Sequence, residues 1–380
     1  MTTRIDPTQF VGHLHTSGLD LWAGVPDSLL KDLCAAASET LGDRFVISAN
    51  EGNAVGAACG WYVGTGRPAV VYMQNSGEGN AVNPLLSLAD PDVYGIPMLL
   101  IVGWRGEPGV PDEPQHRKQG KVTTSLLDAM GIPFEVLDPE HWESQVEGLL
   151  QRMRKESRPV ALVVRKATFA SHAFKPEATN DPLTREEALS AILEVVGPDD
   201  IVVATTGKCG REVFELREAR GEGHERDLLC VGGMGHTLSV AWGMALGQPE
   251  RAVWCLDGDG SMIMHMGSLA VCAQSWPRNL HYVVNVNGAH ESVGGQPNVA
   301  SSIDVPGIIR ACGLGEALVA RTTDEVTAAT AALARNDARA LVLHTRQGSR
   351  DDLGRPTVTP SGNMGAMMAL MDSAGKWEVA

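Results

Sequence analysis

The feature that most constrains the fold is the alternation of short apolar runs with amphipathic segments along the whole chain. The runs rich in Val, Ile and Leu are predicted strands, at Ala69–Met73, Met98–Val102, Val160–Val164, Ile201–Ala204, Ala252–Leu256, His281–Asn285 and Ala340–His344. Between them lie helical segments such as Trp142–Lys155, whose apolar face holds Val146, Leu149, Leu150 and Met153. Strands that alternate with helices form parallel sheets covered on both faces. The predicted class is therefore α/β, with doubly wound parallel sheets.

A polar break near the middle of the chain predicts how it divides into domains. The 380 residues suffice for two α/β domains of ordinary size. The strand–helix pattern stops at Thr168–Thr184, a polar stretch that contains prolines. We therefore predict one domain at residues 1–170, a linker at 171–183 and a second domain at 184–380.

Charge and cysteine usage exclude several kinds of partner. The formal net charge is −15 and no basic run offsets it, so neither nucleic acid nor an anionic membrane is an expected partner. No apolar run approaches the ~18 residues of a membrane-spanning helix, and residues 1–10 lack the apolar core of a signal peptide. The cysteines are scattered, odd in number and never spaced as CxxC. This usage is typical of buried thiols in a reducing cytoplasm.

The sharpest motif is the segment 256–261, Leu-Asp-Gly-Asp-Gly-Ser, which follows an apolar run. A strand that ends in a glycine-rich turn places carboxylates and backbone N–H groups at the carboxyl edge of a sheet. Ligands of α/β folds bind at that edge, and phosphates favour the start of the helix that follows.

Five interpretations of this motif are open at first. A calcium loop requires glycine and glutamate where Met262 and Ser268 stand, so it is excluded. A phosphatase of the haloacid dehalogenase type would use Asp257 as its nucleophile, but its acidic pair, here 351–352, does not directly follow an apolar strand. The glycines at 232–235 do not match GxGxxG, which disfavours a nucleotide site. A turn that only caps a strand, and a metal site, are the other two interpretations, and the phosphatase stays a remote alternative.

A second segment favours the metal site. Asn287 comes 28 residues after Asp259, at the end of another predicted strand. Because carboxyl ends of parallel strands meet at one edge, the two side chains are expected to face one another. Magnesium prefers oxygen ligands and commonly shares them with a phosphate group.

This pattern resembles the thiamine-diphosphate enzymes, whose signature is GDG followed one strand later by an asparagine pair. Val286 stands where the first asparagine is expected. The resemblance implies thiamine diphosphate and Mg²⁺ as cofactors, with Asp259, Asn287 and the carbonyl of Ala289 as metal ligands. It implies cofactor contacts at Glu51, Thr206, Gly207, Gly232, Met234, Asp259, Gly260, Ser261 and Asn287.

Three further positions gain a role from the same resemblance. Met234 lies 25 residues before Asp259 at the start of a helix, where the family places an apolar wedge that bends the cofactor. The carbonyl of Gly232 would accept a hydrogen bond from the cofactor's amino group. Glu51 opens a helix of small residues, and the resemblance implies that it bonds N1′ of the pyrimidine. Taken alone, Met234 is a core methionine and Glu51 a match to the helix dipole.

The resemblance extends over most of the chain to the phosphonopyruvate decarboxylases. It is carried by the phrases at 24–28 (GVPDS), 73–77 (MQNSG), 103–109 (GWRGEPG), 112–116 (DEPQH), 205–208 (TTGK), 291–297 (ESVGGQP) and 352–356 (DLGRP). Departures are Gly233, where serine is expected, and His290, where tyrosine is expected. The resemblance implies a pyrimidine-binding and a diphosphate-binding domain without a middle domain. It also implies a homo-oligomer whose active site lies between subunits.

The implied activity is decarboxylation of an anionic 2-oxo acid in the cytoplasm. The first choice is conversion of 3-phosphonopyruvate to phosphonoacetaldehyde and CO₂ through a thiamine-diphosphate ylid and enamine, in phosphonate natural-product biosynthesis. Sulfopyruvate decarboxylase, or another 2-oxo acid decarboxylase, is the alternative. A cofactor-free subunit belongs to a different class, which the joint presence of Glu51, Asp259 and Asn287 disfavours.

A phosphonate requires cations, and the planar fork of arginine suits it best. The candidate substrate-binding residues are Asp27, Arg105, Lys118, Lys121, Lys208, Arg350 and Arg355. Solvated surface charge is the alternative for about half of the basic residues. His116 is the second candidate catalytic residue beside Glu51, because an imidazole can shuttle protons near neutral pH.

Overall fold

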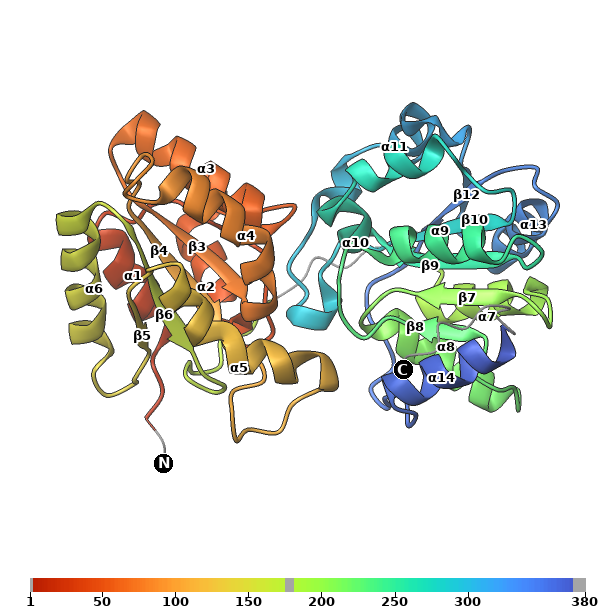
Figure 1. Ribbon diagram of the computed structural model, residues 1–380, viewed down its shortest axis with the longest axis horizontal. Coiled ribbons are helices and arrows are strands. Elements are labelled where there is room, and N and C mark those ends of the chain that lie inside the picture. Colours follow the sequence, from red (N-terminus) through yellow and green to blue (C-terminus); the bar gives the residue numbers. More distant parts are fainter. Residues whose placement is uncertain (1–2, 175–180, 372–380) are drawn as a thin grey trace, which may run out of the picture. The chain divides into compact units, whose positions relative to one another are not determined.

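The computed structural model describes residues 3–174 and 181–371, and these fall into two compact units (Figure 1). The first unit contains residues 3–174 and 290–296, and the second contains 181–289 and 297–371. Part of the predicted linker, residues 175–180, lies outside the described residues. The predicted domain bounds at 170 and 184 stay predictions.

The first unit is built on a six-stranded parallel sheet in the order β2-β1-β3-β4-β6-β5. The strands are β1 (Trp22–Gly24), β2 (Phe45–Ile47), β3 (Ala69–Gln74), β4 (Met98–Gly103), β5 (Phe134–Val136) and β6 (Pro159–Val164). One face packs against α1 (Pro7–Thr16), α2 (Lys31–Leu41) and α6 (Trp142–Glu156). The other face packs against α3 (Glu51–Thr65), α4 (Glu78–Pro84) and α5 (Pro114–Ala129).

The second unit has a six-stranded parallel sheet in the order β11-β12-β10-β9-β7-β8. The strands are β7 (Ile201–Ala204), β8 (Asp227–Leu229), β9 (Val253–Gly258), β10 (Leu280–Val286), β11 (Leu318–Ala320) and β12 (Ala340–His344). One face packs against α7 (Arg185–Val195), α8 (Lys208–Ala219) and α13 (Thr323–Ala334). The other packs against α9 (Thr237–Gly247), α10 (Asp259–Met264), α11 (Gly267–Ala273), α12 (Val305–Ile309) and α14 (Pro360–Leu370).

Short helical turns complete the two units. They are η1 (Gly42–Arg44), η2 (Asn75–Gly77), η3 (Leu85–Ala89), η4 (Glu291–Val293), η5 (Val299–Ser302) and η6 (Arg310–Leu314). None of the helices in residues 3–174 and 181–371 is long and apolar enough to cross a membrane. The cysteines all lie within these residues and are free thiols, most of them buried.

The two sheets share one topology, which confirms the predicted pair of doubly wound parallel sheets. Counted from the edge strand, the order second-first-third-fourth-sixth-fifth holds in both units. The connections therefore change direction between β1 and β3 in the first sheet, and between β7 and β9 in the second. Open α/β sheets bind ligands outside the carboxyl ends of the strands at such a switch point. A ligand site is therefore expected at the loops that follow these four strands.

Candidate active site

In the second unit, the acidic motif and the asparagine predicted to face it lie side by side. Asp259 begins α10 directly after β9, and Asn287 follows the neighbouring strand β10. The Asp259 carboxylate accepts hydrogen bonds from the backbone N–H groups of Gly260 (2.6 Å), Asn287 (3.1 Å) and Gly288 (2.8 Å). The structure therefore brings Asp259 and Asn287 together at the carboxyl edge of the sheet.

The loop after β10 also holds the third predicted metal ligand. The side-chain oxygen of Asn287 accepts a hydrogen bond from the N–H of Ala289 at 3.0 Å. Gly288 between them has a φ of 71°, a conformation that glycine adopts without strain. The carbonyl of Asn287 accepts a bond from Nε2 of Gln347 at 3.3 Å, a residue that the sequence did not suggest.

This edge of the sheet buries carboxylates without a basic partner. Burial raises the pKa of Asp259 to about 6, against the opposing effect of the N–H groups of Gly288 and Gly260. Burial also raises the pKa of Asp257. Among the described residues, no lysine or arginine forms an ion pair with either carboxylate. A divalent cation would favour their ionised forms, so the donor set suits a hard metal ion.

The donors present also fit a cation that shares its ligands with a phosphate. No group of three or more His, Cys, Asp or Glu side chains suited to a metal ion occurs within residues 3–174 and 181–371. A cation at Asp259 would therefore need amide, carbonyl and ligand oxygens, and Asn287, Ala289 and a diphosphate would be the source of them.

The remaining predicted cofactor residues of the second unit line the same edge. The N–H of Gly235 donates to the Ser261 hydroxyl at 3.1 Å, which joins the glycine segment before α9 to the acidic motif. Gly232 and Met234 precede this contact and are half-buried. Thr206 and Gly207 follow β7 and lead into α8. These segments meet at the switch point between β7 and β9.

In the first unit, Glu51 is held at the start of α3 by Gly77 and Asn80, to which the sequence assigned no role. Its side chain is buried, and its carboxylate accepts a hydrogen bond from Nδ2 of Asn80 at 2.7 Å. A Cβ atom at Gly77 would collide with the Glu51 carboxylate, so only glycine allows this approach. The signal for Asn80 and Gly77 was a cluster of small and polar residues directly after the apolar strand β3.

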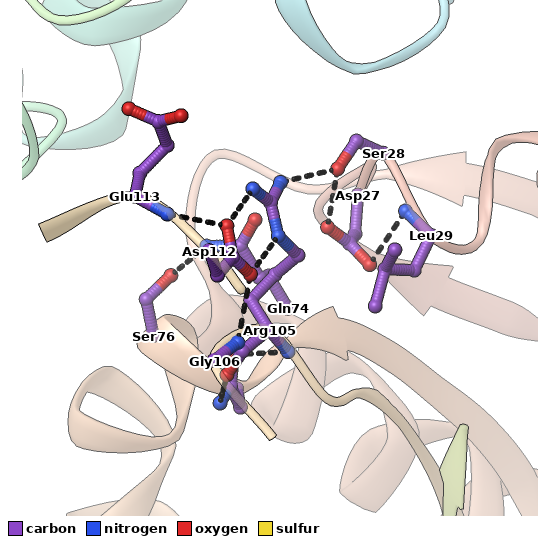
Figure 2. A network of polar contacts seen from close by, with 10 residues as sticks. Asp27, Ser28, Leu29, Gln74, Ser76, Arg105, Gly106, Asp112 and Glu113 are labelled. Carbon is purple, nitrogen blue, oxygen red and sulfur yellow. Dashed lines mark hydrogen bonds and ion pairs between the residues drawn. The ribbon is translucent and has the colours of Figure 1, made fainter. Parts of the chain in front are cut away.

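The first unit also contains a polar network around Arg105, which follows β4 (Figure 2). The guanidinium donates to both carboxylate oxygens of Asp112, with Nε 2.8 Å from Oδ2. Its Nη1 donates to the Ser28 hydroxyl at 2.8 Å, and this hydroxyl lies 3.4 Å from Oδ1 of Asp27. The N–H of Gly106 donates to Asp112 at 2.8 Å. Arg105 and Asp27, predicted from separate phrases, therefore belong to one cluster.

Burial shifts the protonation of two predicted residues in this cluster. Burial raises the pKa of Asp27 to about 6, although the charge of Arg105 opposes the shift. Burial, assisted by the charge of Arg105 and opposed by Asp112, lowers the pKa of His116 to about 4. His116 is thus uncharged near neutral pH and can only accept a proton there, whereas the sequence suggested a group that titrates in that range. Its Nδ1 is buried without a hydrogen-bond partner.

Comparison with known proteins identifies the family to which this chain belongs. Residues 8–130 match the N-terminal TPP-binding domain of thiamine pyrophosphate enzymes, and residues 205–344 match their C-terminal TPP-binding domain. Phosphonopyruvate decarboxylase of Streptomyces viridochromogenes is 34% identical, over 94% of this chain and 92% of that protein. The chain belongs to the phosphonopyruvate decarboxylase family of thiamine-pyrophosphate enzymes.

Two other known proteins are similar to this chain. Phosphonopyruvate decarboxylase of Streptomyces hygroscopicus is 32% identical, over 94% of this chain and 91% of that protein. Sulfopyruvate decarboxylase of Methanosarcina acetivorans is 28% identical, over 78% and 80% of the two chains. The chain is a thiamine-diphosphate-dependent decarboxylase, and this replaces the phosphatase and strand-cap interpretations of the acidic motif.

The other basic candidates of the decarboxylase differ from Arg105 in their surroundings. Lys118 and Lys121 are exposed on α5, and Lys208 is half-buried at the start of α8. Arg355 is exposed. Arg350 is also exposed, and it forms ion pairs with three carboxylates, those of Glu186, Glu215 and Asp352. Arg105 differs from both exposed arginines because it is half-buried, with its guanidinium held by Asp112 and Ser28.

We expect Asp27→Asn to stabilise the cofactor-free decarboxylase at neutral pH. Folded Asp27 holds its proton more tightly than unfolded Asp27, so wild-type stability falls as pH rises from 3.8 to about 6. A shift of about two pKa units corresponds to roughly 3 kcal/mol, all of it lost above pH 6. Urea unfolding at pH 4 and pH 7 measures this loss, which should be absent in Asp27→Asn. Asp128→Asn, at an exposed position on α5, is the control. Equal pH dependence in wild type and Asp27→Asn would contradict the assignment.

Proposed function

We propose that the chain decarboxylates 3-phosphonopyruvate to phosphonoacetaldehyde and CO₂, with thiamine diphosphate and Mg²⁺, as a cytoplasmic step of phosphonate biosynthesis. The observation that carries the proposal is the Arg105 cluster, a fixed guanidinium between Asp112 and Ser28 at the carboxyl edge of the first sheet. The names of the two Streptomyces relatives point to the same substrate.

The second unit is proposed to hold the diphosphate end of the cofactor. Asp259, Asn287 and the carbonyl of Ala289 would bind Mg²⁺. The Asp259 carboxylate is buried and has no basic partner among the described residues, so a cation would stabilise its ionised form. The N–H groups and hydroxyls at Thr206, Gly207, Gly260 and Ser261 would bind the diphosphate oxygens. Gly232 and Met234 would contact the pyrimidine and thiazolium rings.

The first unit is proposed to hold the pyrimidine end. When bound, thiamine diphosphate supplies the carbon nucleophile and the electron sink that decarboxylation requires. Glu51 would hold a proton at N1′ of the pyrimidine, and the Asn80 amide keeps one carboxylate oxygen occupied and directed. Because the Glu51 side chain is only 4% exposed, water competes little for this hydrogen bond.

Arg105 is proposed to bind the phosphonate, with Lys118, Lys121, Lys208 and Arg355 as further candidates. A phosphonate dianion matches the guanidinium fork as a carboxylate does, so it can take the place that Asp112 occupies in the ligand-free chain. A dianion beside His116 would also raise the low pKa of this imidazole and allow it to hold a proton.

We also propose a homo-oligomer with the active site between subunits. In the first unit the exposed side of α3 consists mainly of small residues. It also includes Val63, near the end of the helix, which is 77% exposed. In the second unit Leu246 of α9 and Val271 of α11 are exposed. Uncovered apolar faces of this kind favour association.

The proposal is tested by CO₂ release from phosphonopyruvate, sulfopyruvate and pyruvate, with and without thiamine diphosphate and Mg²⁺. We expect kcat/KM for pyruvate to be lower than for phosphonopyruvate by roughly 10²- to 10³-fold, because unpaired buried charged donors cost about 3–4 kcal/mol. Arg105→Met should lower kcat/KM for phosphonopyruvate and leave that for pyruvate nearly unchanged. Equal values for the two acids would refute the substrate assignment, and a preference for sulfopyruvate would favour the alternative.

A further inference from the structure

Asn298 is a polar residue beside the proposed metal site that no part of the proposed function uses. It directly follows the sequence phrase 291–297 and precedes the helical turn η5. Its Nδ2 atom is buried and makes no hydrogen bond to any of the described residues. A buried donor without an acceptor costs free energy, so such an atom marks a place where a ligand can supply the acceptor.

The contacts of the other end of the amide fix the orientation of the Asn298 side chain. Oδ1 accepts a hydrogen bond from the N–H of Ala300 at 2.9 Å, which makes Asn298 the N-cap of η5. If the amide were turned around, its NH₂ group would face this N–H, and two donors would oppose each other. The NH₂ group is therefore the end of the amide that lacks an acceptor.

The backbone of Asn298 belongs to a segment that braces the proposed metal-binding loop. Its N–H donates to the carbonyl of Gly288 at 2.8 Å, and the N–H of Gly288 donates to the Asp259 carboxylate at 2.8 Å. The preceding residue, Pro297, pairs with Ala289 in an antiparallel bridge. Burial raises the pKa of Asp259, and the Asn298 side chain is one of the groups that oppose this shift. The amide of Asn298 therefore lies next to the carboxylate that is proposed to bind the cation.

The hydrogen bonds of Asp259 leave little room for the Asn298 amide on the carboxylate itself. Oδ2 accepts from the N–H groups of Asn287 and Gly288, and Oδ1 accepts from that of Gly260. A carboxylate has about four lone pairs, so one remains. A cation bound to Asp259 takes this lone pair, and Nδ2 then requires an acceptor on another oxygen of the site.

The other protein oxygens of the site are the side-chain oxygen of Asn287 and the carbonyl of Ala289, both proposed metal ligands. The Asn287 oxygen already accepts from the N–H of Ala289 at 3.0 Å. Neither oxygen accepts from Nδ2 of Asn298 in the ligand-free chain. The oxygens that a cation shares with a diphosphate remain. These oxygens are negatively charged, and hydrogen bonds to charged acceptors are roughly twice as strong as those to neutral ones.

We propose that Asn298 is a further cofactor-binding residue, whose side-chain NH₂ group donates a hydrogen bond to a diphosphate oxygen beside the metal ion. The inference rests on the proposed placement of the cofactor's diphosphate in the second unit. It does not depend on which oxo acid is decarboxylated. The two ends of one amide then serve different purposes, because Oδ1 caps η5 and Nδ2 binds the cofactor.

The variant Asn298→Ser separates these two purposes. Serine is as good an N-cap as asparagine, so its hydroxyl can accept from the N–H of Ala300, but it has no NH₂ group. We expect the Kd of thiamine diphosphate, measured by calorimetry at saturating Mg²⁺, to rise about 10- to 100-fold, the range of a hydrogen bond to a charged group. The melting temperature of the cofactor-free protein should stay near that of wild type.

Two further variants control for the loss of a cap. Asn298→Ala lacks both the cap and the NH₂ group, so it should bind the cofactor as weakly as Asn298→Ser and melt at a lower temperature. Asp304→Ser exchanges the exposed N-cap of α12 in the same unit, and it should bind the cofactor as wild type does.

Inorganic diphosphate locates the contact on the cofactor. With Mg²⁺ it carries the proposed acceptor without the two rings, so Asn298→Ser should weaken its binding by the same factor as that of thiamine diphosphate. The phosphorus NMR resonances of the bound cofactor should also shift between wild type and Asn298→Ser, and not between wild type and Asp304→Ser. Wild-type affinity of Asn298→Ser for inorganic diphosphate would contradict the inference.

A magnesium titration distinguishes this contact from mere support of Asp259. If Asn298 only supported the metal ligand, Asn298→Ser would require more Mg²⁺ for half-maximal cofactor binding and would match wild type at saturation. That result would overturn the inference, as would an unchanged Kd.

The same measurements separate this inference from the proposed function. If wild type binds the cofactor but releases CO₂ from none of the three oxo acids, the proposed substrates are wrong, and the binding data still decide the role of Asn298. If wild type binds neither thiamine diphosphate nor inorganic diphosphate with Mg²⁺, the role proposed for Asn298 is wrong as well.

Discussion

Asp259→Asn is expected to remove metal-dependent turnover while the second unit stays folded. The amide keeps an oxygen that can accept the N–H bonds of Asn287 and Gly288 but loses the charge that a cation requires. Because changes outside the ligand set already cost 10- to 100-fold in many metal sites, we expect a loss of kcat/KM of more than about 10²-fold. Added magnesium should restore little. Asp259→Ala should be equally inactive and less stable by about 1–3 kcal/mol, because the N–H groups of Gly260, Asn287 and Gly288 lose their acceptor.

Magnesium titrations of cofactor binding and thermal unfolding of both variants check this expectation. Asp199→Asn, an exposed site of the same unit, is the matched control. The phosphatase interpretation of the motif makes the opposite prediction. Asp257→Asn would then be the more damaging change, and thiamine diphosphate would have no effect on turnover. Wild-type turnover in Asp259→Asn would show that Asp259 is not a metal ligand.

How much of the fold the sequence predicts depends on strand length. The seven predicted strands all occur, with ends shifted by at most two residues. The strands that were not predicted are β1, β2, β5, β8 and β11, and each has three residues. A three-residue strand is too short to show a periodicity, and its position is set by pairing with a longer neighbour such as β3 or β12.

In the site, too, contacts that follow from strand order were predictable, whereas contacts that depend on loop conformation and packing were not. The meeting of Asp259 with Asn287 follows from two strand ends in one parallel sheet, so the spacing predicts it. The pairing of Arg105 with Asp112 depends on a loop that folds back on itself. The low pKa of His116 depends on its burial in the packed structure, assisted by the charge of Arg105. Composition and periodicity do not contain this information.

The second large effect is expected for Glu51→Gln, which should keep the fold and the cofactor but lose catalytic rate. Glutamine is nearly isosteric, and its side-chain oxygen can still accept the hydrogen bond of Asn80. It lacks the carboxylate that would hold a proton at N1′ of the pyrimidine. General acid–base contributions of this kind are roughly 10²- to 10⁴-fold, or about 3 to 5 kcal/mol of barrier. The loss should therefore appear in kcat, with little change in cofactor affinity.

Hydrogen exchange at C2 of the bound cofactor distinguishes this role from a structural one. If Glu51 acts through N1′, exchange in deuterated water, read by proton NMR after acid quench, should slow together with kcat in Glu51→Gln. If Glu51 only complements the dipole of α3, the variant should lose about 1 kcal/mol of stability or less and exchange at the wild-type rate. Glu143→Gln, at the start of α6, is a matched control for the dipole effect, because its carboxylate also lies in a first helical turn. Wild-type exchange in Glu51→Gln would mean that another group activates the cofactor, and the assignment of the pyrimidine end to the first unit would have to be revised.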